Sequence, residues 1–186
     1  MTDDGASVTR DIDLKSLIRT IPDFPKPGVM FRDVTTLLKD AGGFHAVIEK
    51  LAAAQTGRPI DKVVGIESRG FIIGAALAFR LERGFVPIRK KGKLPAGNFG
   101  EDYVLEYGRD RLEMHCDAIE RGERVLLVDD LIATGGTAEA AARLIRTAGG
   151  SLVGCAFVID LPDLGGRRKL EALGIAVQVL CQFSGH

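Results

Sequence analysis

The sequence predicts an α/β fold in which a mainly parallel central sheet is flanked by helices. Short apolar runs that are typical of buried strands alternate with segments whose apolar residues recur at helical spacing. The run at 124–129 is almost wholly apolar, as expected of a strand covered on both faces. With 186 residues, of which 46% are hydrophobic, the chain suits one domain with a single sizeable core.

The N-terminal third is interrupted by prolines. Residues 1–10 are polar and acidic, and we expect a disordered tail there, followed by a single domain at 11–186. Apolar residues at helical spacing predict a short amphipathic helix over 11–20. The proline-rich stretch at 22–28 ends that helix and is expected to run extended with fixed turns. A second helix is predicted around 44–51.

The remaining two thirds alternate regularly between strands and helices. Residues 89–101 are basic and glycine-rich without periodicity, which indicates a mobile loop, and a hairpin follows at 103–106 and 109–115. Ligands of such sheets bind beyond the carboxyl ends of the strands, here after Glu67, Ile88 and Asp129. The other predicted strands are 62–66, 85–88, 124–129, 152–159 and 175–180, and the predicted helices are 71–82, 137–148 and 166–173.

Composition excludes several classes of function. The 25 basic and 25 acidic residues balance, so no global charge favours nucleic acid or an anionic membrane. There is no signal-peptide core and no apolar run of the roughly 20 residues that span a bilayer, so we expect a cytoplasmic protein. Three widely spaced cysteines without a CxxC pair fit a reducing compartment. Cys155 lies in an apolar run and is interpreted as a core residue, not a catalytic thiol.

The segment 125–137 carries the strongest chemical signal. An apolar strand leads to two adjacent carboxylates, Asp129 and Asp130, and a loop of small residues leads from there into a helix. Backbone N–H groups of such a loop, together with the helix N-terminus, bind a phosphate. The two carboxylates can accept hydrogen bonds from ring hydroxyls, so a ribose 5-phosphate fits the whole segment. The predicted phosphate loop comprises Ala133, Thr134, Gly135, Gly136 and Thr137.

A purely structural interpretation of this segment is an ordinary strand-to-helix turn with Thr137 as the N-cap. It does not explain paired acids at the end of a buried strand, where desolvation is costly. Nucleoside triphosphate loops and dinucleotide-binding folds carry other glycine patterns, and neither occurs here. A nucleotide-binding oxidoreductase is therefore disfavoured.

Segment 125–137 resembles the phosphoribosyl pyrophosphate-binding motif of the type I phosphoribosyltransferases. Three further segments, 22–33, 65–71 and 88–95 with 105–108, resemble members of that family that act on adenine. The similarity runs from about residue 12 to 181, and Glu67 departs from it because relatives often have Asp there. It implies the type I fold, with a small N-terminal hood for base recognition at roughly 11–35 and a flexible catalytic loop.

The resemblance implies a pyrophosphate site at the turn Ser68, Arg69 and Gly70, preceded by a non-proline cis peptide at Glu67–Ser68. It is joined by basic residues after the next strand, Arg89, Lys90 and Lys93, which offset the charge of the leaving pyrophosphate. Arg89 is the best placed of these and is assigned a catalytic role. From the residues alone, Arg69 and the basic run can also be solvated surface.

Residues 94–107 are expected to form a lid that excludes water from an oxocarbenium-like ribosyl cation. The resemblance makes Glu106 the catalytic carboxylate near the base, with Tyr107 beside it in the closed lid. Glu106 is suited to accept a proton from the purine as N9 becomes the nucleophile. Without the resemblance, it can equally be a surface residue of the hairpin.

The proline-rich segment is expected to form the adenine pocket. Phe31 would stack on the purine, Arg32 would reach its edge, and backbone groups around Val29 and Met30 would distinguish a 6-amino from a 6-oxo group. This assignment comes from the resemblance, since Phe31 alone can equally be a core residue.

The implied reaction transfers the phosphoribosyl group from phosphoribosyl pyrophosphate to N9 of adenine, giving AMP and pyrophosphate in purine salvage. Magnesium is expected to come with the substrate, with Asp129 and Asp130 contacting it at most through water. A homodimer is expected, without nucleic acid or membrane partners. Two rivals stay open: transfer to another base, such as a 6-oxopurine or orotate, and a regulator that binds phosphoribosyl pyrophosphate without turnover.

Overall fold

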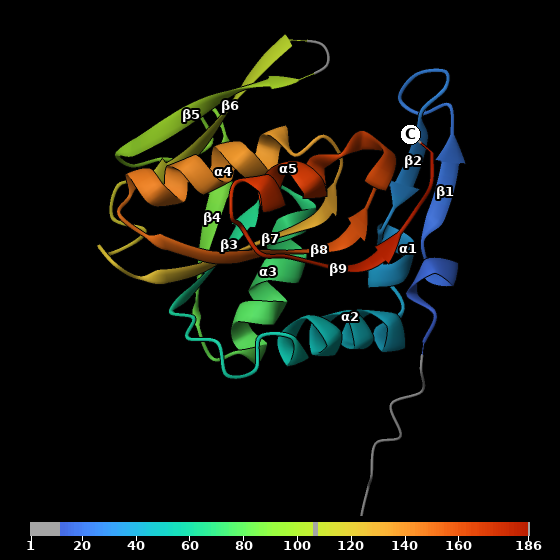
Figure 1. The fold of residues 1–186 in the computed structure, drawn as a ribbon, viewed down its shortest axis with the longest axis horizontal. Coiled ribbons are helices and arrows are strands. Elements are labelled where there is room, and N and C mark those ends of the chain that lie inside the picture. The colour runs from blue at the N-terminus through green and yellow to red at the C-terminus, as the bar shows by residue number, and fades with distance from the viewer. Residues whose placement is uncertain (1–11, 106–107, 186) are drawn as a thin grey trace, which may run out of the picture.

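The computed structural model describes residues 12–105 and 108–185. Its centre is a seven-stranded sheet of order β5-β6-β4-β3-β7-β8-β9 (Figure 1). The five strands from β4 to β9 in that order are parallel, and the β5–β6 hairpin adds an antiparallel edge. The predicted mainly parallel sheet is thus confirmed. The strands are β3 (Lys62–Ile66), β4 (Gly84–Lys90), β5 (Asn98–Leu105), β6 (Gly108–His115), β7 (Arg124–Ile132), β8 (Ser151–Asp160) and β9 (Val177–Gln182).

Helices cover both faces of the sheet (Figure 1). On one face lie α4 (Gly136–Thr147) and α5 (Gly166–Ala172), and on the other α2 (Ala41–Ala53) and α3 (Arg69–Arg80). The central strand β7 supplies alternate side chains to the two cores: Val125 and Leu127 to the first, Leu126 and Val128 to the second. A strand buried on both faces must be apolar throughout, which explains the unbroken apolar run in the sequence.

The N-terminal region differs from the prediction. In place of a helix over 11–20, a single 3₁₀ turn at Leu14–Leu17 leads into strand β1 (Arg19–Pro22). Leu14 and Ile18 are both buried, so one turn already satisfies the helical spacing. Residues beyond Ile18 instead pair with β2 (Met30–Asp33), because a partner strand offers more hydrogen bonds than another helical turn. The predicted tail at 1–10 lies outside the described residues.

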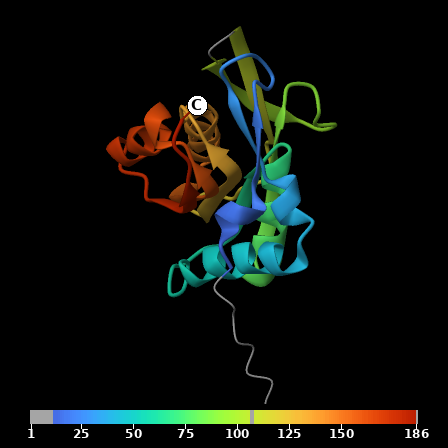
Figure 2. The same cartoon turned by 90° about the vertical axis from the view of Figure 1, so that its right-hand side faces the viewer.

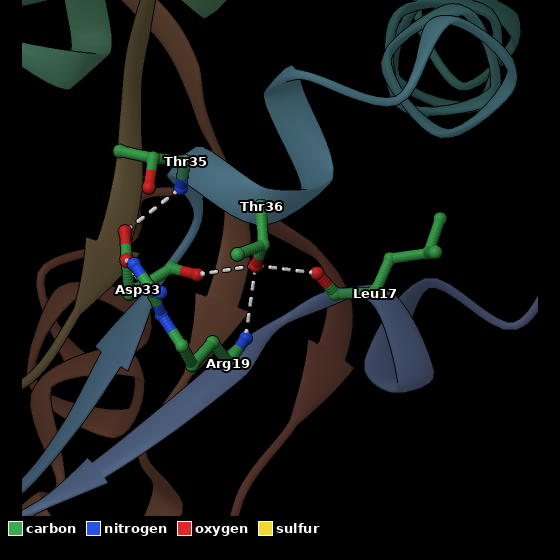
Figure 3. Close-up of polar contacts among 5 residues, drawn as sticks. All are labelled: Leu17, Arg19, Asp33, Thr35 and Thr36. Carbon is green, nitrogen blue, oxygen red and sulfur yellow. Dashed lines mark hydrogen bonds and ion pairs between the residues drawn. The ribbon is translucent and has the colours of Figure 1, made fainter.

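A polar network ties this β1–β2 hairpin to the short helix α1 (Thr35–Leu38) (Figure 3). The Thr36 hydroxyl donates to the Leu17 carbonyl at 2.7 Å and accepts from the backbone N–H of Arg19 at 3.1 Å. The buried Asp33 carboxylate accepts from the backbone N–H of Thr35 at 2.9 Å and pairs with the Arg19 guanidinium. The start of β1 and the end of β2 are therefore fixed to the core. The turn between the two strands is left to carry functional groups.

Several strands extend further than predicted. β4 continues through Lys90 and β5 begins at Asn98, so the predicted loop 89–101 shrinks to the residues between them. β7 continues through Ile132, beyond the two acids. The hairpins β1–β2 and β5–β6 rise from the same side of the molecule (Figure 2). In the part of the chain described, no helix has the length and apolarity needed to cross a membrane.

Candidate active site

A cleft of about 560 Å³ opens at the carboxyl ends of β4, β3 and β7, which are neighbours in the sheet. The sequence predicted that the residues following these strands would meet, and they do. The β5–β6 hairpin contributes a further wall. The lining residues are Glu67, Ser68, Arg69, Lys90, Lys93, Tyr103, Asp110, Asp129, Asp130 and Thr137.

The predicted phosphate loop forms a second, smaller pocket of about 150 Å³, lined by every residue from Leu131 to Ala138 together with Asp129 and Phe157. Gly135 has φ +80° and precedes the first residue of α4, so it occupies the N-cap position. This corrects the structural interpretation in which Thr137 caps the helix. Thr137 and Asp129 line both the pocket and the cleft, so the two cavities adjoin.

The loop is held from behind by Gly166, which sequence reasoning missed. The Gly166 N–H donates to the Ala133 carbonyl at 2.9 Å, and a Cβ on Gly166 would lie 2.3 Å from that oxygen. A Cβ on Gly135 would in turn lie 3.0 Å from the Gly166 backbone. The loop and the start of α5 can approach this closely because both Gly135 and Gly166 lack a side chain. The pair Gly165 and Gly166 before a predicted helix was the signal available in the sequence.

The two acids of β7 lie beside the turn that follows β3. β3 pairs with β7 from Val125 to Val128, and β7 continues along β8 as far as Ile132. Asp130 is buried and pairs with the Arg69 guanidinium. Asp129 accepts a hydrogen bond from the Asp130 N–H at 2.9 Å. Burial raises the pKa of Asp129 well above its ordinary value, and the adjacent Asp130 carboxylate raises it further.

The turn after β3 packs tightly on β7. The Glu67–Ser68 peptide bond is cis, as expected, and α3 begins directly afterwards at Arg69. A Cβ on Gly70 would lie 2.7 Å from Asp129 Oδ1 and 3.0 Å from the Val128 carbonyl oxygen. Gly70 is thus required for the close approach of the turn to the acids, in addition to the pyrophosphate role predicted for it.

Two of the basic residues predicted for pyrophosphate, Arg89 and Lys90, are paired with carboxylates. The Arg89 Nε lies 3.1 Å from Glu67 Oε2, and the Lys90 backbone N–H donates to the same oxygen at 3.1 Å. The Lys90 ammonium lies 3.4 Å from Asp110 on β6. Lys93 lies close to Arg89, because the Arg89 guanidinium donates a hydrogen bond to the Lys93 carbonyl oxygen at 3.2 Å. Glu67, the departure from the family pattern, therefore acts as the partner of Arg89.

Two cleft residues on the β5–β6 hairpin were not predicted. Tyr103 is buried, and its hydroxyl donates to the Asp110 carboxylate at 3.2 Å and also interacts with the Thr137 side chain. Burial, followed by the charge of Asp110, raises the pKa of Tyr103 to about 12, so the hydroxyl stays protonated and remains a donor. Only the pairing of β5 with β6 places these residues opposite one another, and no sequence pattern indicates it.

The predicted base-binding residues divide between two faces of β2. Phe31 lies edge-on to Phe24, with ring centroids 5.1 Å apart, and the Arg69 guanidinium lies 5.8 Å from its ring. The Arg32 side chain points the other way, donating to Thr20 at 2.6 Å and lying 4.6 Å from the Phe183 ring. Neighbouring side chains of a strand face opposite directions, so Phe31 and Arg32 cannot both face the cleft. Met30 and Val29 adjoin Phe31 at the hairpin turn.

Two predicted residues, Glu106 and Tyr107, lie outside the described residues. Within the described ranges, no group of three or more His, Cys, Asp or Glu side chains could hold a metal ion. The arrangement can nevertheless bind several charged groups of one ligand in a row: a phosphate at the loop, hydroxyls at the paired acids, and a second anion at the turn and basic residues.

Comparison with known proteins agrees with this arrangement. The model of the phosphoribosyl transferase domain matches residues 35–176, which includes the loop, both acids and the basic residues. Fold and site therefore define a phosphoribosyltransferase. The β1–β2 hairpin precedes the matched residues, as expected of a part that varies among enzymes with different bases.

Relatives that match most of the chain show to which group of phosphoribosyltransferases it belongs. The chain is 64% identical to an adenine phosphoribosyltransferase of Methylobacillus flagellatus, over 92% of this chain and 98% of the relative. The structure of the enzyme from Rhodothermus marinus matches with a TM-score of 0.87 and 55% identity, covering 91% and 96%. The structure of the enzyme from Saccharomyces cerevisiae, solved with adenine and a bisphosphate, matches with a TM-score of 0.84 and 41% identity. The match covers 90% of this chain and 96% of the yeast chain. The chain belongs to the adenine phosphoribosyltransferase family.

Proposed function

We propose that the chain transfers the 5-phosphoribosyl group from phosphoribosyl pyrophosphate to N9 of adenine, giving AMP and pyrophosphate for purine salvage. The observation that carries the proposal is the adjacency of the two cavities through Asp129 and Thr137. A single ligand can then place a phosphate in the loop, a ribose over the acids and a pyrophosphate at the turn. The family of the chain supports the same reaction.

In this proposal, the loop 133–137 binds the 5′-phosphate through backbone N–H groups and the start of α4. Asp129 and Asp130 accept hydrogen bonds from the ribose hydroxyls. Hydrogen bonds donated by those hydroxyls favour the ionised carboxylate, and they would lower the pKa of Asp129 from the value raised by burial and by Asp130. The turn 68–70 and Arg89 bind the pyrophosphate and offset its charge.

The bond from C1′ to the pyrophosphate oxygen breaks, and its electron pair leaves with the pyrophosphate. N9 of adenine donates a pair to C1′, and its proton passes to Glu106. The β5–β6 hairpin closes over the ribosyl cation and excludes water. Phe31 contacts the purine ring, and backbone groups at Val29 and Met30 bind its edge. Arg32 supports this pocket from behind through Thr20 and Phe183.

Magnesium enters, in this proposal, as a complex with phosphoribosyl pyrophosphate, whose own oxygens are the ligands that Mg²⁺ prefers. Asp130 already pairs with Arg69 and Asp129 accepts from the backbone, so these acids fit contact through bound water better than direct ligation. The metal offsets charge on the pyrophosphate, alongside Arg69 and Lys90.

The deciding experiment measures pyrophosphate release from purified protein with magnesium and phosphoribosyl pyrophosphate, with adenine, hypoxanthine, guanine and orotate offered in parallel. Release with adenine alone is expected. Release with another base would keep the transfer chemistry but overturn the assignment of residues 22–33 to adenine. Tight binding of phosphoribosyl pyrophosphate without release with any base would favour a regulator.

A cytoplasmic homodimer is the form that we propose for the enzyme. α3 exposes Ile72 and Phe79, 48% and 87% accessible, seven residues apart and so on one side of the helix. Large apolar side chains gathered on one surface favour contact with another copy. The three free cysteines fit a reducing compartment. Sedimentation analysis should give twice the chain mass, and Phe79→Ser should shift it toward the monomer.

A further inference from the structure

The charges that line the cleft do not form a simple anion site. Three cations, Arg69, Lys90 and Lys93, face four carboxylates, Glu67, Asp110, Asp129 and Asp130. A ligand as negative as pyrophosphate should favour a surplus of cations, because each carboxylate in contact with it adds repulsion. The acids of β7 and Glu67 have partners or roles that explain them. Asp110 has partners in Tyr103 and Lys90, but it has no role in the reaction as described so far.

The β5–β6 hairpin places Asp110 on β6, two residues from Leu112, which pairs with Lys90 of β4. Asp110 lies opposite Tyr103 of β5, and the Tyr103 hydroxyl orients its carboxylate at 3.2 Å. Its side chain is 24% exposed, and the Lys90 ammonium lies 3.4 Å away. Lys90 is the last residue of β4 and follows Arg89, which is expected to bind pyrophosphate. The ion pair therefore joins the hairpin to the pyrophosphate end of the cleft.

We propose that Asp110 is a positioning residue that holds Lys90 in the cleft until pyrophosphate takes over the lysine. The inference rests on the proposed function. Phosphoribosyl pyrophosphate binding would replace one carboxylate partner of Lys90 by phosphate oxygens, and release of pyrophosphate would restore the original pair. Asp110 thereby weakens the binding of pyrophosphate and helps the product to leave.

Tyr103 extends this link to the phosphate loop. Its hydroxyl contacts both Asp110 and the Thr137 side chain, which lines the phosphate pocket. The hairpin thus contacts the 5′-phosphate side and the pyrophosphate side through one tyrosine. A substrate that occupies both sides would lie against the same hairpin at its 5′-phosphate and at its pyrophosphate.

The test compares Asp110→Asn with the unchanged protein by calorimetric titration of inorganic pyrophosphate with magnesium, without base. Asparagine keeps the shape and still accepts from Tyr103, but it no longer pairs electrostatically with Lys90. Pyrophosphate affinity should rise about three- to tenfold, as expected for loss of a partly exposed ion pair and of one repulsive charge. The KM for phosphoribosyl pyrophosphate should fall in parallel, while kcat stays equal or falls because product leaves more slowly.

The matched control is Glu123→Gln, which removes the same charge from a lysine pair at the other end of β7. Glu123 lies 2.9 Å from Lys62, outside the cleft. Its substitution should leave pyrophosphate affinity unchanged. Lys90→Met provides the second control, because in that background Asp110→Asn should gain clearly less than in the unchanged protein.

Unchanged or weaker pyrophosphate binding in Asp110→Asn would overturn the proposal and make Asp110 part of the hairpin scaffold or a ligand-binding group. An equal gain in the Lys90→Met background would assign the effect to repulsion alone and would also overturn the pairing. Failure of the proposed function is distinguishable, because the unchanged protein would then release no pyrophosphate with any base, whatever Asp110→Asn does to the affinity for pyrophosphate.

Discussion

The two ends of the substrate site are built on opposite principles. At the 5′-phosphate end, the backbone of loop 133–137 is fixed against Gly166, and the pocket is about 150 Å³. At the end proposed for pyrophosphate, the cleft is about 560 Å³, and long cationic side chains line it from the turn after β3 and from the end of β4 with the turn that follows. These side chains are already paired with carboxylates of the protein: Arg69 with Asp130, Arg89 with Glu67, and Lys90 with Asp110.

This difference follows from what each end does in the reaction. The 5′-phosphate stays attached to the ribose throughout, so a rigid cradle of N–H groups suits it and needs no rearrangement. The pyrophosphate enters bound and leaves free, so the protein needs cations that can change partners. Under the proposal, exchange of ion pairs would lower the net affinity for the product, whereas a preformed cradle would retain the sugar phosphate.

The largest expected effect concerns Glu106, the carboxylate to which the proposal assigns the proton transfer. Glu106→Gln removes the carboxylate proposed to accept the N9 proton, and kcat should fall by about 100-fold or more. Binding of phosphoribosyl pyrophosphate, measured by calorimetry, should remain near normal. Glu171→Gln, which alters a carboxylate paired with Arg167 on α5, should keep full turnover. Near-normal kcat in Glu106→Gln would remove this residue from the mechanism.

The acids between the two ends should control affinity for the sugar. The double change Asp129→Asn with Asp130→Asn loses charged acceptors for the ribose hydroxyls and frees Arg69. Each charge-assisted hydrogen bond contributes about 1.5–3 kcal/mol, and asparagine still accepts a neutral one of about 0.5–1.5 kcal/mol, so two losses of about 1 kcal/mol each should lower the affinity for phosphoribosyl pyrophosphate about 10- to 100-fold. Inorganic phosphate should bind the variant as before, since the loop is intact. If affinity for phosphoribosyl pyrophosphate does not change, the acids do not bind the ribose.

The rigidity of the phosphate cradle is tested by Gly166→Ala. The new methyl group would lie 2.3 Å from the Ala133 carbonyl oxygen and 2.6 Å from the Gly135 nitrogen, so the loop must move. Such overpacking costs about 1–3 kcal/mol, to be measured by urea unfolding, and phosphate affinity should fall with it. Gly84→Ala is the control, because its methyl group would meet side-chain atoms of Lys62 no closer than 3.8 Å. Equal stability of the two variants would contradict a tightly fixed cradle.

The smallest expected effect concerns Asp33, which anchors the hood to the core. Hydrogen bonds from Thr35 and Arg19 lower the pKa of Asp33 to about 2 (Figure 3). A pKa that is lower in the folded than in the unfolded state stabilises the protein above pH 4, and this contribution is lost as pH falls from about 4 to about 2. Asp33→Asn should therefore reduce the free energy of unfolding by about 1–2 kcal/mol at pH 7.

That loss should shrink as the pH approaches 3, when unfolding is followed by urea titration across the range. A deficit that stays the same at every pH would show that the Asp33 charge does not contribute. Activity at neutral pH distinguishes the anchor from the site itself, because a displaced hood should raise the KM for adenine more than that for phosphoribosyl pyrophosphate.

Local patterns identified most of the central part of the site. The run 125–137 combines a buried strand, two acids and a small-residue loop, and each of these features is encoded within a few neighbouring residues. The cis bond at Glu67–Ser68 and the position of α3 also agree with expectation. The roles assigned to Glu106 and Tyr107 remain predictions, since both lie outside the described residues.

Residues whose roles depend on distant partners were missed or misplaced. Gly166 is separated by about thirty residues from the loop that it supports. Tyr103 and Asp110 meet only through the register of β5 and β6. The helix expected over 11–20 is a single 3₁₀ turn at Leu14–Leu17, and the chain then enters a strand because Met30–Asp33 supplies a partner that local spacing cannot reveal. The side chains of Phe31 and Arg32 point to opposite faces of β2 because the strand is pleated, with Phe31 near Arg69 and Arg32 near Phe183.

The sequence by itself determined the alternation of strands and helices, the parallel core and the phosphate loop with its acids, because short-range periodicity and local backbone chemistry encode them. Tertiary structure decided which carboxylate neutralises each cation, which face of the hood points inward, and how closely two glycine backbones approach. Those features depend on pairing register and on distances between segments far apart in the chain, and no local pattern contains that information.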